Sequence, residues 1–328
     1  MPYYDSFNRP IEYLRISITD RCNLRCVYCM PEEGVPQLDH ADILRYEEIV
    51  RLVRTIVGLG VSKVRITGGE PLVRKGVESL VGMLAAIPGV GDLSMTTNGT
   101  LLAAKAEALA AAGLKRVNVS LDTLHPERFR AMTRRGRLED VMAGLEAAKR
   151  AGLEPIKINV VVIRGLNDTE VVDFARRTVA DGWHVRFIEV MPLGPGALWA
   201  HDGFVPAAEV RRRIEAEFGP LVAIDGHGGG PARYYQIGGA AGTIGFISPL
   251  SEHFCFRCNR LRLTAHGQLM PCLMSEQAID LRTPLRAGVT DEALCELVLQ
   301  AISAKPAGHR LAAQKYPLGA TPMSRIGG

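Results

Sequence analysis

The sequence predicts an α/β fold, namely an incomplete TIM-like (β/α)6 barrel whose open side is closed by a C-terminal β-rich extension. Two observations lead to this prediction. Short β-rich runs alternate with amphipathic helical patterns over the first two-thirds of the 328 residues, which is typical of repeated βα units and a parallel sheet. In addition, one face of the predicted strands is polar, whereas an open sheet covered by helices on both faces would be apolar on both.

Six strands are expected from the β-rich runs, and helical patterns separate them. The stretches 44–60 and 138–152 are two such patterns, and both end at glycine, as helices commonly do. The strands are expected at 14–19, 63–67, 92–97, 116–120, 156–162 and 184–190.

Polar side chains recur on one face of five of these strands, while Ile and Val dominate the other face. Cations that face a lumen would be costly if they were left unpaired, and an anionic ligand would offset that cost. The alternative is a register shifted by one residue, which would place the same side chains at strand ends in solvent. The polar positions are Arg15, Ser17, Arg65, Thr67, Ser94, Thr96, Asn118, Ser120, Lys157 and Asn159.

The pattern changes after residue 200. A helix is expected at about 206–217, followed by glycine-rich DGHGGGPA, short hairpin-like strands, two helical stretches and a tail that contains Pro and Gly. We therefore expect a partial barrel over 1–200, a C-terminal domain over 201–315 and a tail over 316–328.

The composition is that of a compact soluble protein. Hydrophobic residues make up 47% and charged residues 23% of the chain, and the net charge of +4 is spread along it. No apolar run approaches the ~20 residues of a membrane span, and the first residues lack the pattern of a signal peptide. We expect a cytoplasmic protein that binds neither nucleic acid nor membrane.

The seven cysteines form two groups of three, with Cys295 left alone. In a reducing compartment, such grouping indicates metal or redox chemistry rather than a disulfide scaffold. Cys295 lies within the apolar stretch EALCELVLQAI and is expected to be a small buried core residue.

The first group, Cys22, Cys26 and Cys29, directly follows the first predicted strand, at the end where parallel α/β folds keep their active sites. A closed zinc site needs four ligands and a ferredoxin cluster needs four cysteines, but the next cysteine is Cys255. A cluster held by three thiolates would leave one iron open. The alternative is a zinc knuckle completed by a remote histidine.

This spacing, with Tyr28 before the last cysteine and Gly68-Gly69-Glu70-Pro71 after the second strand, resembles the radical S-adenosylmethionine (SAM) superfamily. The resemblance implies that the open iron chelates the methionine moiety of SAM, and that reduction of the cluster yields a 5′-deoxyadenosyl radical. It also implies a cofactor site formed by Tyr28, Gly69, Ser120 and Met191.

The second group consists of Cys255, Cys258 and Cys272. By itself it could be a zinc ribbon with His253 or His266 as the fourth ligand, since paired cysteines beside a hairpin are ordinary zinc geometry. Beside the first group, a second iron–sulfur cluster with an open iron is the preferred interpretation.

Taken together, the motifs resemble the family of GTP 3′,8-cyclases, radical SAM lyases that begin molybdenum cofactor biosynthesis. The arrangement of three plus three cysteines is more diagnostic than any single motif. The matching segments are LRISITDRCNLRCVYCMPEEG, RITGGEPLVR, TTNG, VSLD, IKINVV, FIEVMP, the CNRLRLT segment and the terminal Gly-Gly.

The family resemblance implies two [4Fe–4S] clusters, with GTP held between them and its guanine at the open iron of the C-terminal cluster. It implies GTP binding by Arg15, Arg65, Thr96, Lys157, Arg260 and Arg262. It further implies catalytic roles for Arg260, Arg262, Gly327 and Gly328, with the double glycine entering the active site. The alternative for the tail is a mobile terminus.

The same resemblance implies a reaction and partners. The adenosyl radical would remove the ribose 3′ hydrogen of GTP, and the carbon radical would attack guanine C8. A flavodoxin or ferredoxin would donate electrons, cyclic pyranopterin monophosphate synthase would be the next enzyme, and the protein would form a homodimer. The alternatives are a radical SAM enzyme that modifies a peptide and a zinc-binding module without catalysis.

Overall fold

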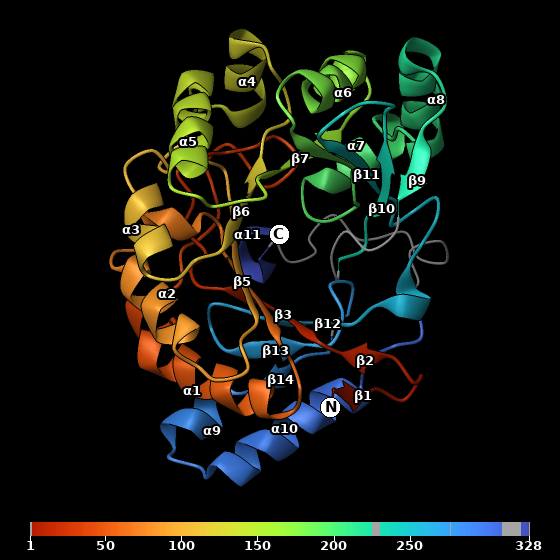
Figure 1. The fold of residues 1–328 in the computed structure, drawn as a ribbon. Coiled ribbons are helices and arrows are strands. Elements are labelled where there is room, and N and C mark those ends of the chain that lie inside the picture. The colour runs from red at the N-terminus through yellow and green to blue at the C-terminus, as the bar shows by residue number, and fades with distance from the viewer. Residues whose placement is uncertain (1, 225–229, 276, 310–322, 328) are drawn as a thin grey trace.

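The protein is described by a computed structural model that covers residues 2–224, 230–275, 277–309 and 323–327. Its centre is a curved sheet of parallel strands connected by helices (Figure 1). These strands are β3 (Tyr13–Ser17), β4 (Lys63–Thr67), β5 (Asp92–Thr97), β6 (Arg116–Ser120), β7 (Lys157–Val162) and β8 (His184–Glu189), and they pair in that order.

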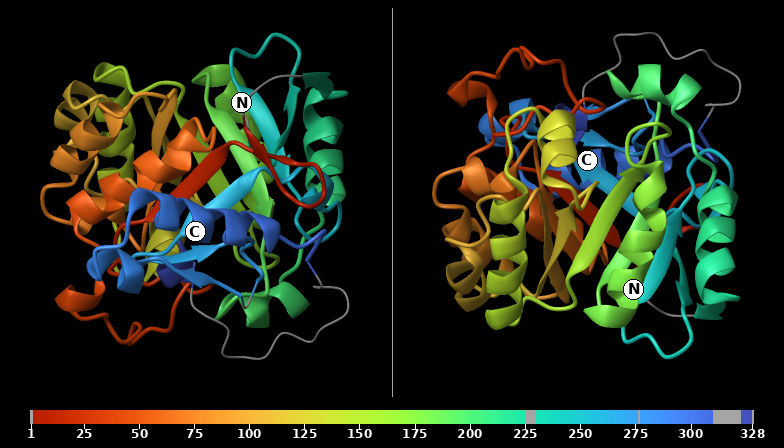
Figure 2. Two further views of the ribbon diagram at one scale, coloured as in Figure 1. Left: turned by 90° about the horizontal axis from the view of Figure 1, so that it is seen from below. Right: turned by 90° about the horizontal axis from the view of Figure 1, so that it is seen from above.

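Helices cover the outer face of this sheet, as both views of Figure 2 show. Leu14, Ile16, Val64 and Ile66 point outward and are fully buried under them. Burial of each such side chain contributes about 1.5–3 kcal/mol, so this face anchors the barrel. The helices are α1 (Tyr46–Gly58), α2 (Val77–Ala85), α3 (Ala106–Ala111), α4 (Pro126–Thr133), α5 (Leu138–Arg150) and α6 (Val171–Ala180).

The C-terminal part of the chain continues the same sheet at both edges. At one edge β11 (Thr243–Ile247) runs parallel to β8, followed by antiparallel β10 (Arg233–Gln236) and β9 (Val222–Ile224). At the other edge β12 (Arg260–Leu263) runs parallel to β3, followed by antiparallel β13 (Gln268–Met270) and β14 (Ile279–Asp280). The described strands thus form a twelve-stranded sheet that does not close on itself.

The remaining elements lie in different places around the sheet. The N-terminal hairpin lies near α10 in Figure 1, whereas α11 lies inside the curve of the sheet. These elements are β1 (Tyr3–Tyr4), β2 (Pro10–Ile11), α7 (Gly196–Asp202), α8 (Ala207–Phe218), α9 (Arg282–Arg286), α10 (Asp291–Ser303) and α11 (Met323–Ile326), together with 3-10 turns at His40–Asp42, Pro71–Val73, Asp168–Glu170 and Cys255–Arg257.

The predicted fold class is confirmed, and the six predicted strands are the six central strands. Three have the predicted bounds, two differ by one residue at one end, and the first lies at 13–17 rather than at 14–19. A register shifted by one residue is wrong, because Arg65 and Lys157 are buried and face the lumen. One expectation is also wrong: Cys295 is partly exposed on α10, where it borders α1, rather than buried in the core.

Strand register explains why the polar side chains meet. In neighbouring strands Arg262 pairs with Arg15, Arg15 with Arg65, Arg65 with Ser94, and Ser94 with Arg116. Paired residues of adjacent strands point to the same face. One row across the concave face therefore carries four arginines. No helix in the described part of the chain has the length and apolar character needed to cross a membrane.

Two helical glycines test the packing of the outer layer. A Cβ at Gly144 in α5 would lie 2.4 Å from the carbonyl oxygen of Gly99, whereas a Cβ at Gly58 in α1 would meet nothing within 4 Å. We expect Gly144→Ala to lower the free energy of unfolding by about 1–3 kcal/mol, because the added methyl group would overpack the contact with Gly99. Gly58→Ala should leave it unchanged or raise it by about 0.5–1 kcal/mol. The midpoint of thermal unfolding, followed by circular dichroism, measures both; equal midpoints would contradict this packing.

Candidate active site

A cavity of about 350 Å³ lies on the concave face of the sheet. Residues that are far apart in the sequence line it, because strands from both parts of the chain belong to the same sheet. The predicted site residues that line it are Cys22, Cys26, Cys29, Cys255, Cys258, Cys272, Tyr28, Gly69, Ser120, Met191, Arg15, Arg65, Thr96, Lys157, Arg260 and Arg262.

The first cysteine loop follows β3 and is partly buried. Leu24 donates its backbone N–H to the Cys22 sulfur at 3.4 Å, and the Asn98 amide approaches the same sulfur at 3.9 Å. Burial raises the pKa of Cys22 to about 11. Burial, together with the charges of Cys29 and Cys22, raises the pKa of Cys26 well above its usual range. These thiols are therefore held in the neutral form, and a bound metal cation would be needed to stabilise them as thiolates.

The arrangement of the cysteine sulfurs in this loop can be compared with what a single metal ion and an iron–sulfur cluster require. In the part of the chain that the structure describes, no three His, Cys, Asp or Glu side chains converge on the position of a single metal ion. In a [4Fe–4S] cluster each thiolate binds a different iron atom, so the sulfurs need not converge on one point. The three cysteines of the first triad therefore have the donor set of a [4Fe–4S] cluster with one open iron.

The Gly68–Pro71 turn lies directly against this loop. A Cβ at Gly69 would stand 2.4 Å from the Arg21 carbonyl oxygen, so only glycine permits this approach of two backbones. Glu70 is buried and accepts hydrogen bonds from the backbone N–H groups of Leu72 and Asn98. Burial raises the pKa of Glu70 to about 7. This carboxylate holds the turn beneath the cysteine loop.

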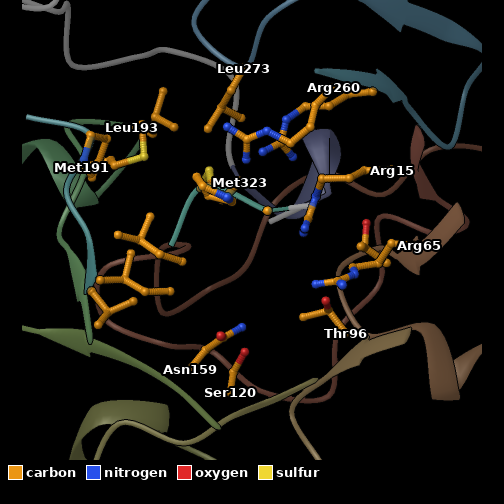
Figure 3. A pocket seen from close by; sticks show the side chains of 18 of the residues that line it. Arg15, Arg65, Thr96, Ser120, Asn159, Met191, Leu193, Arg260, Leu273 and Met323 are labelled. Atoms are coloured by element: carbon orange, nitrogen blue, oxygen red, sulfur yellow. The ribbon is translucent and has the colours of Figure 1, made fainter. Parts of the chain in front are cut away.

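Tyr28 is held by a residue that the sequence prediction missed. Its hydroxyl donates to Asp122 at 2.7 Å, and the other Asp122 carboxylate oxygen accepts the N–H of Val161 at 2.8 Å. Burial raises the pKa of Asp122 to about 6. Asp122 closes the VSLD motif just after Ser120, so the signal was a carboxylate at the end of a strand. Ser120 and Met191 also line the cavity, Ser120 beside Asn159 and Met191 beside Leu193 (Figure 3).

Basic side chains dominate the middle of the cavity. Burial lowers the pKa of Arg65 to about 9. It also lowers the pKa of Lys157 to about 7, with help from the positive charge of Arg186. Arg65 donates to the Ser94 hydroxyl at 3.1 Å, and Lys157 lies 3.4 Å from the Tyr234 hydroxyl. These cations repel one another, so a polyanion in the cavity would stabilise them.

Arg186 on β8 also belongs to this group and was missed by the sequence prediction. It is 6% exposed, and its Nε and Nη2 atoms have no hydrogen-bond partner among the described residues. The alternation of the sixth strand could have revealed it, since His184 and Arg186 share one face. Arg116, which also lines the cavity, is paired with Asp92 at 2.5 Å.

The cysteines of the second group differ in their surroundings, and burial raises the pKa of Cys255. Burial opposes ionisation of Cys258, but Arg260 and Lys305 more than offset it and lower the pKa of this thiol to about 6. The Arg260 Nη2 atom lies 3.8 Å from the Cys258 sulfur. Figure 3 shows Arg15, Arg65 and Arg260 on one side of the cavity, across from Met191 and Leu193.

The C-terminal tail reaches the cavity. Met323 lines it, and Arg262 donates from Nη1 to the Gly327 carbonyl oxygen at 2.5 Å. Gly327 has φ +79°, and a Cβ there would stand 2.4 Å from the Thr67 hydroxyl oxygen. A side chain would therefore clash. Gly328 lies outside the described residues.

Comparison with known proteins agrees with this geometry. Residues 16–178 match the model of the radical SAM superfamily, and residues 183–311 match the model Molybdenum Cofactor Synthesis C. The GTP 3′,8-cyclase of Pelotomaculum thermopropionicum is 55% identical over 94% of this chain and 95% of its own length. That of Heliobacterium modesticaldum is 52% identical over 99% of each chain.

Among solved structures, Streptococcus suis SuiB bound to S-adenosylmethionine matches with a TM-score of 0.60 at 14% identity. The match covers 84% of this chain and 65% of that one, and it shows a shared fold. Membership of the radical SAM superfamily implies one [4Fe–4S] cluster and SAM, which the first triad fits. The full-length identity to curated relatives goes further: the chain belongs to the GTP 3′,8-cyclase family.

Proposed function

We propose that this protein converts GTP to (8S)-3′,8-cyclo-7,8-dihydroguanosine 5′-triphosphate, in the first step of molybdenum cofactor biosynthesis. The observation that carries the proposal is a cation-rich cavity with a cysteine triad towards each end. The first triad follows the carboxyl end of β3, whereas Cys258 precedes the amino end of β12, which runs parallel to β3. The row of arginines lies between these ends.

At the carboxyl end of the strands we assign the SAM site. The Asp122 hydrogen bond fixes the Tyr28 hydroxyl, and the Gly68–Pro71 turn presents backbone beside the first triad. When bound, the cluster and SAM supply a 5′-deoxyadenosyl radical. The chain's contribution is to hold the reactants in place and to exclude water, for which the apolar walls formed by Met191, Leu193 and Leu273 are suited.

The middle of the cavity we assign to the triphosphate of GTP. Arginine presents a planar fork of donors that matches phosphate oxygens, and such charge-assisted hydrogen bonds are the strong ones. The buried Arg186, with two free donor atoms, extends the predicted set. The residues assigned to GTP are Arg15, Arg65, Thr96, Lys157, Arg186, Arg260 and Arg262.

At the other end we assign a second [4Fe–4S] cluster to Cys255, Cys258 and Cys272, with guanine beside it. The lowered pKa of Cys258 supports a thiolate ligand there. The contact of Arg262 with the Gly327 carbonyl and the position of Arg260 beside Cys258 support roles of both arginines in orienting the base. We propose catalytic roles for Arg260, Arg262, Gly327 and Gly328, as the resemblance to the family implies.

Family membership supports the rest of the proposal. A flavodoxin or ferredoxin would supply electrons, and the product would pass to cyclic pyranopterin monophosphate synthase, in the cytoplasm. We also propose a homodimer, and a division into a barrel over 1–200, a cluster domain over 201–315 and a tail over 316–328. The two family models, which meet near residue 180, support a division of the chain into two parts.

A labelled substrate tests the reaction. Reduced protein is incubated with SAM and with GTP that carries deuterium at the ribose 3′ position. We expect deuterium in the 5′-deoxyadenosine, measured by mass spectrometry, because the radical removes this hydrogen. GTP deuterated at the 2′ position is the control and should transfer none. Unlabelled 5′-deoxyadenosine from the 3′-labelled substrate, formed at the rate of GTP consumption, would refute the cyclase assignment.

A second prediction concerns Arg186. Arg186→Met removes a buried cation that repels its neighbours, so we expect the melting temperature of the ligand-free protein to stay equal or rise. GTP affinity should fall by about 10- to 100-fold, since a hydrogen bond to a charged group contributes about 1.5–3 kcal/mol. Calorimetry measures the affinity, and Arg150→Met on the exposed face of α5 is the control. Unchanged affinity would remove Arg186 from the site.

A third prediction uses the titration of Lys157. Its pKa near 7 means that the free protein loses this charge as the pH rises from 6 to 8.5. Anion binding favours the charged form, so GTP affinity should decline over this range. Lys157→Met should bind more weakly at pH 6 and lose this component of the pH dependence. The γ-phosphate titrates in both proteins, so the difference between the two affinity profiles isolates Lys157; parallel profiles would contradict the assignment.

A further inference from the structure

Two buried cations outside the GTP set hold the backbone around the second triad. Lys305, just after α10, is 3% exposed. Its ammonium donates to the carbonyl oxygens of Arg260 and Pro271, each at 2.7 Å. Pro271 precedes Cys272, and Arg260 lies two residues after Cys258. One ammonium group therefore joins the two segments that carry these cysteines.

Arg9 does the same for the remaining cysteine. It is 4% exposed and donates to the carbonyl oxygen of Cys255 at 2.7 Å, and to those of Pro306 and Ala307 at 2.8 and 3.1 Å. Its charge is balanced, since its Nε atom lies 2.6 Å from the Asp5 carboxylate. Arg9 thus fixes the Cys255 segment without adding net charge.

Lys305 differs from Arg9 in its charge balance. No carboxylate within the described ranges forms an ion pair with it. Burial of an uncompensated ammonium is costly, so an anion should lie nearby. The anions with which it interacts favourably are the thiolates of Cys258 and Cys272. Hydrogen bonds and fixed charges around a metal group set ligand geometry and redox potential.

We propose that Lys305 is a positioning residue for the second cluster: it fixes the separation of the segments that carry Cys258 and Cys272, and its positive charge balances their thiolates. The inference rests on the proposed assignment of a second [4Fe–4S] cluster to this triad. Reduction adds negative charge to a cluster. The ammonium group therefore favours the reduced state, and its removal should shift the equilibrium towards the oxidised state.

The experiment isolates the second cluster in the full-length chain. Cys22, Cys26 and Cys29 are changed to Ser, so that only the second triad can hold iron. Into this parent we introduce Lys305→Gln, which keeps a hydrogen-bond donor but loses the charge, and Lys305→Met, which loses both. Lys149→Met, at an exposed position of α5, is the matched control. Iron and sulfide content, redox titration followed by electron paramagnetic resonance, and apoprotein melting are measured.

We expect Lys305→Gln to hold iron and to shift the reduction equilibrium about tenfold towards the oxidised state, which is a midpoint 59 mV lower for one electron. Lys305→Met should retain at most half of the parent's iron, and the control should match the parent. If neither variant holds iron but both apoproteins melt at the same temperature as the parent, the result supports the proposal that Lys305 positions the cluster ligands.

Three other outcomes overturn the inference. A loaded Lys305→Gln protein whose equilibrium lies within twofold of the parent would show that the charge has no effect. Full iron content in Lys305→Met would show that the cluster does not need the joined segments. Apoprotein melting more than about 10 °C below the parent for both variants would make Lys305 part of the fold. A parent without iron at the second triad would instead refute the proposed second cluster.

Discussion

The central physical constraint in this molecule is the burial of like charges. Arg65, Lys157, Arg186 and Arg262 are all less than 9% exposed and share the concave face of one sheet. Strand register aligns Arg262 and Arg65 with Arg15 in one row, whereas Lys157 pairs with His184 and Arg186 with Asn159. The apolar outer face, sealed by helices, supplies the stability that this arrangement requires. A bound polyanion would offset the free-energy cost of burying these cations on the inner face of the sheet.

The two cysteine triads differ in the charges and the burial around their sulfur atoms. At the first triad burial raises the pKa of Cys22 and Cys26, and Glu70 adds unfavourable negative charge. At the second triad Arg260 and Lys305 favour the thiolate of Cys258. A cluster at the second triad would therefore sit in a more positive environment than one at the first. Two clusters of one type would differ in redox potential for this reason alone.

Much of the fold and site could be predicted from the sequence because strand periodicity is strict. Alternation at every second residue located Arg15, Arg65 and Lys157 on one face, and the structure keeps them there. Arg186 was missed because Ile188 follows it on the same face and breaks the polar pattern. Lys305 could not be predicted, since nothing local in the apolar stretch before it indicates which carbonyl groups it will meet.

The residues that hold the second triad in place come from almost the whole length of the chain. Arg9 near one end contacts Cys255 and Ala307 near the other, and Lys305 joins two further segments. The three cysteines of the first triad, by contrast, lie within eight consecutive residues. A growing chain offers the first triad early, but it cannot assemble the second until residue 307 has left the ribosome. The second cluster proposed above would therefore have to be inserted after nearly the whole chain has been synthesised.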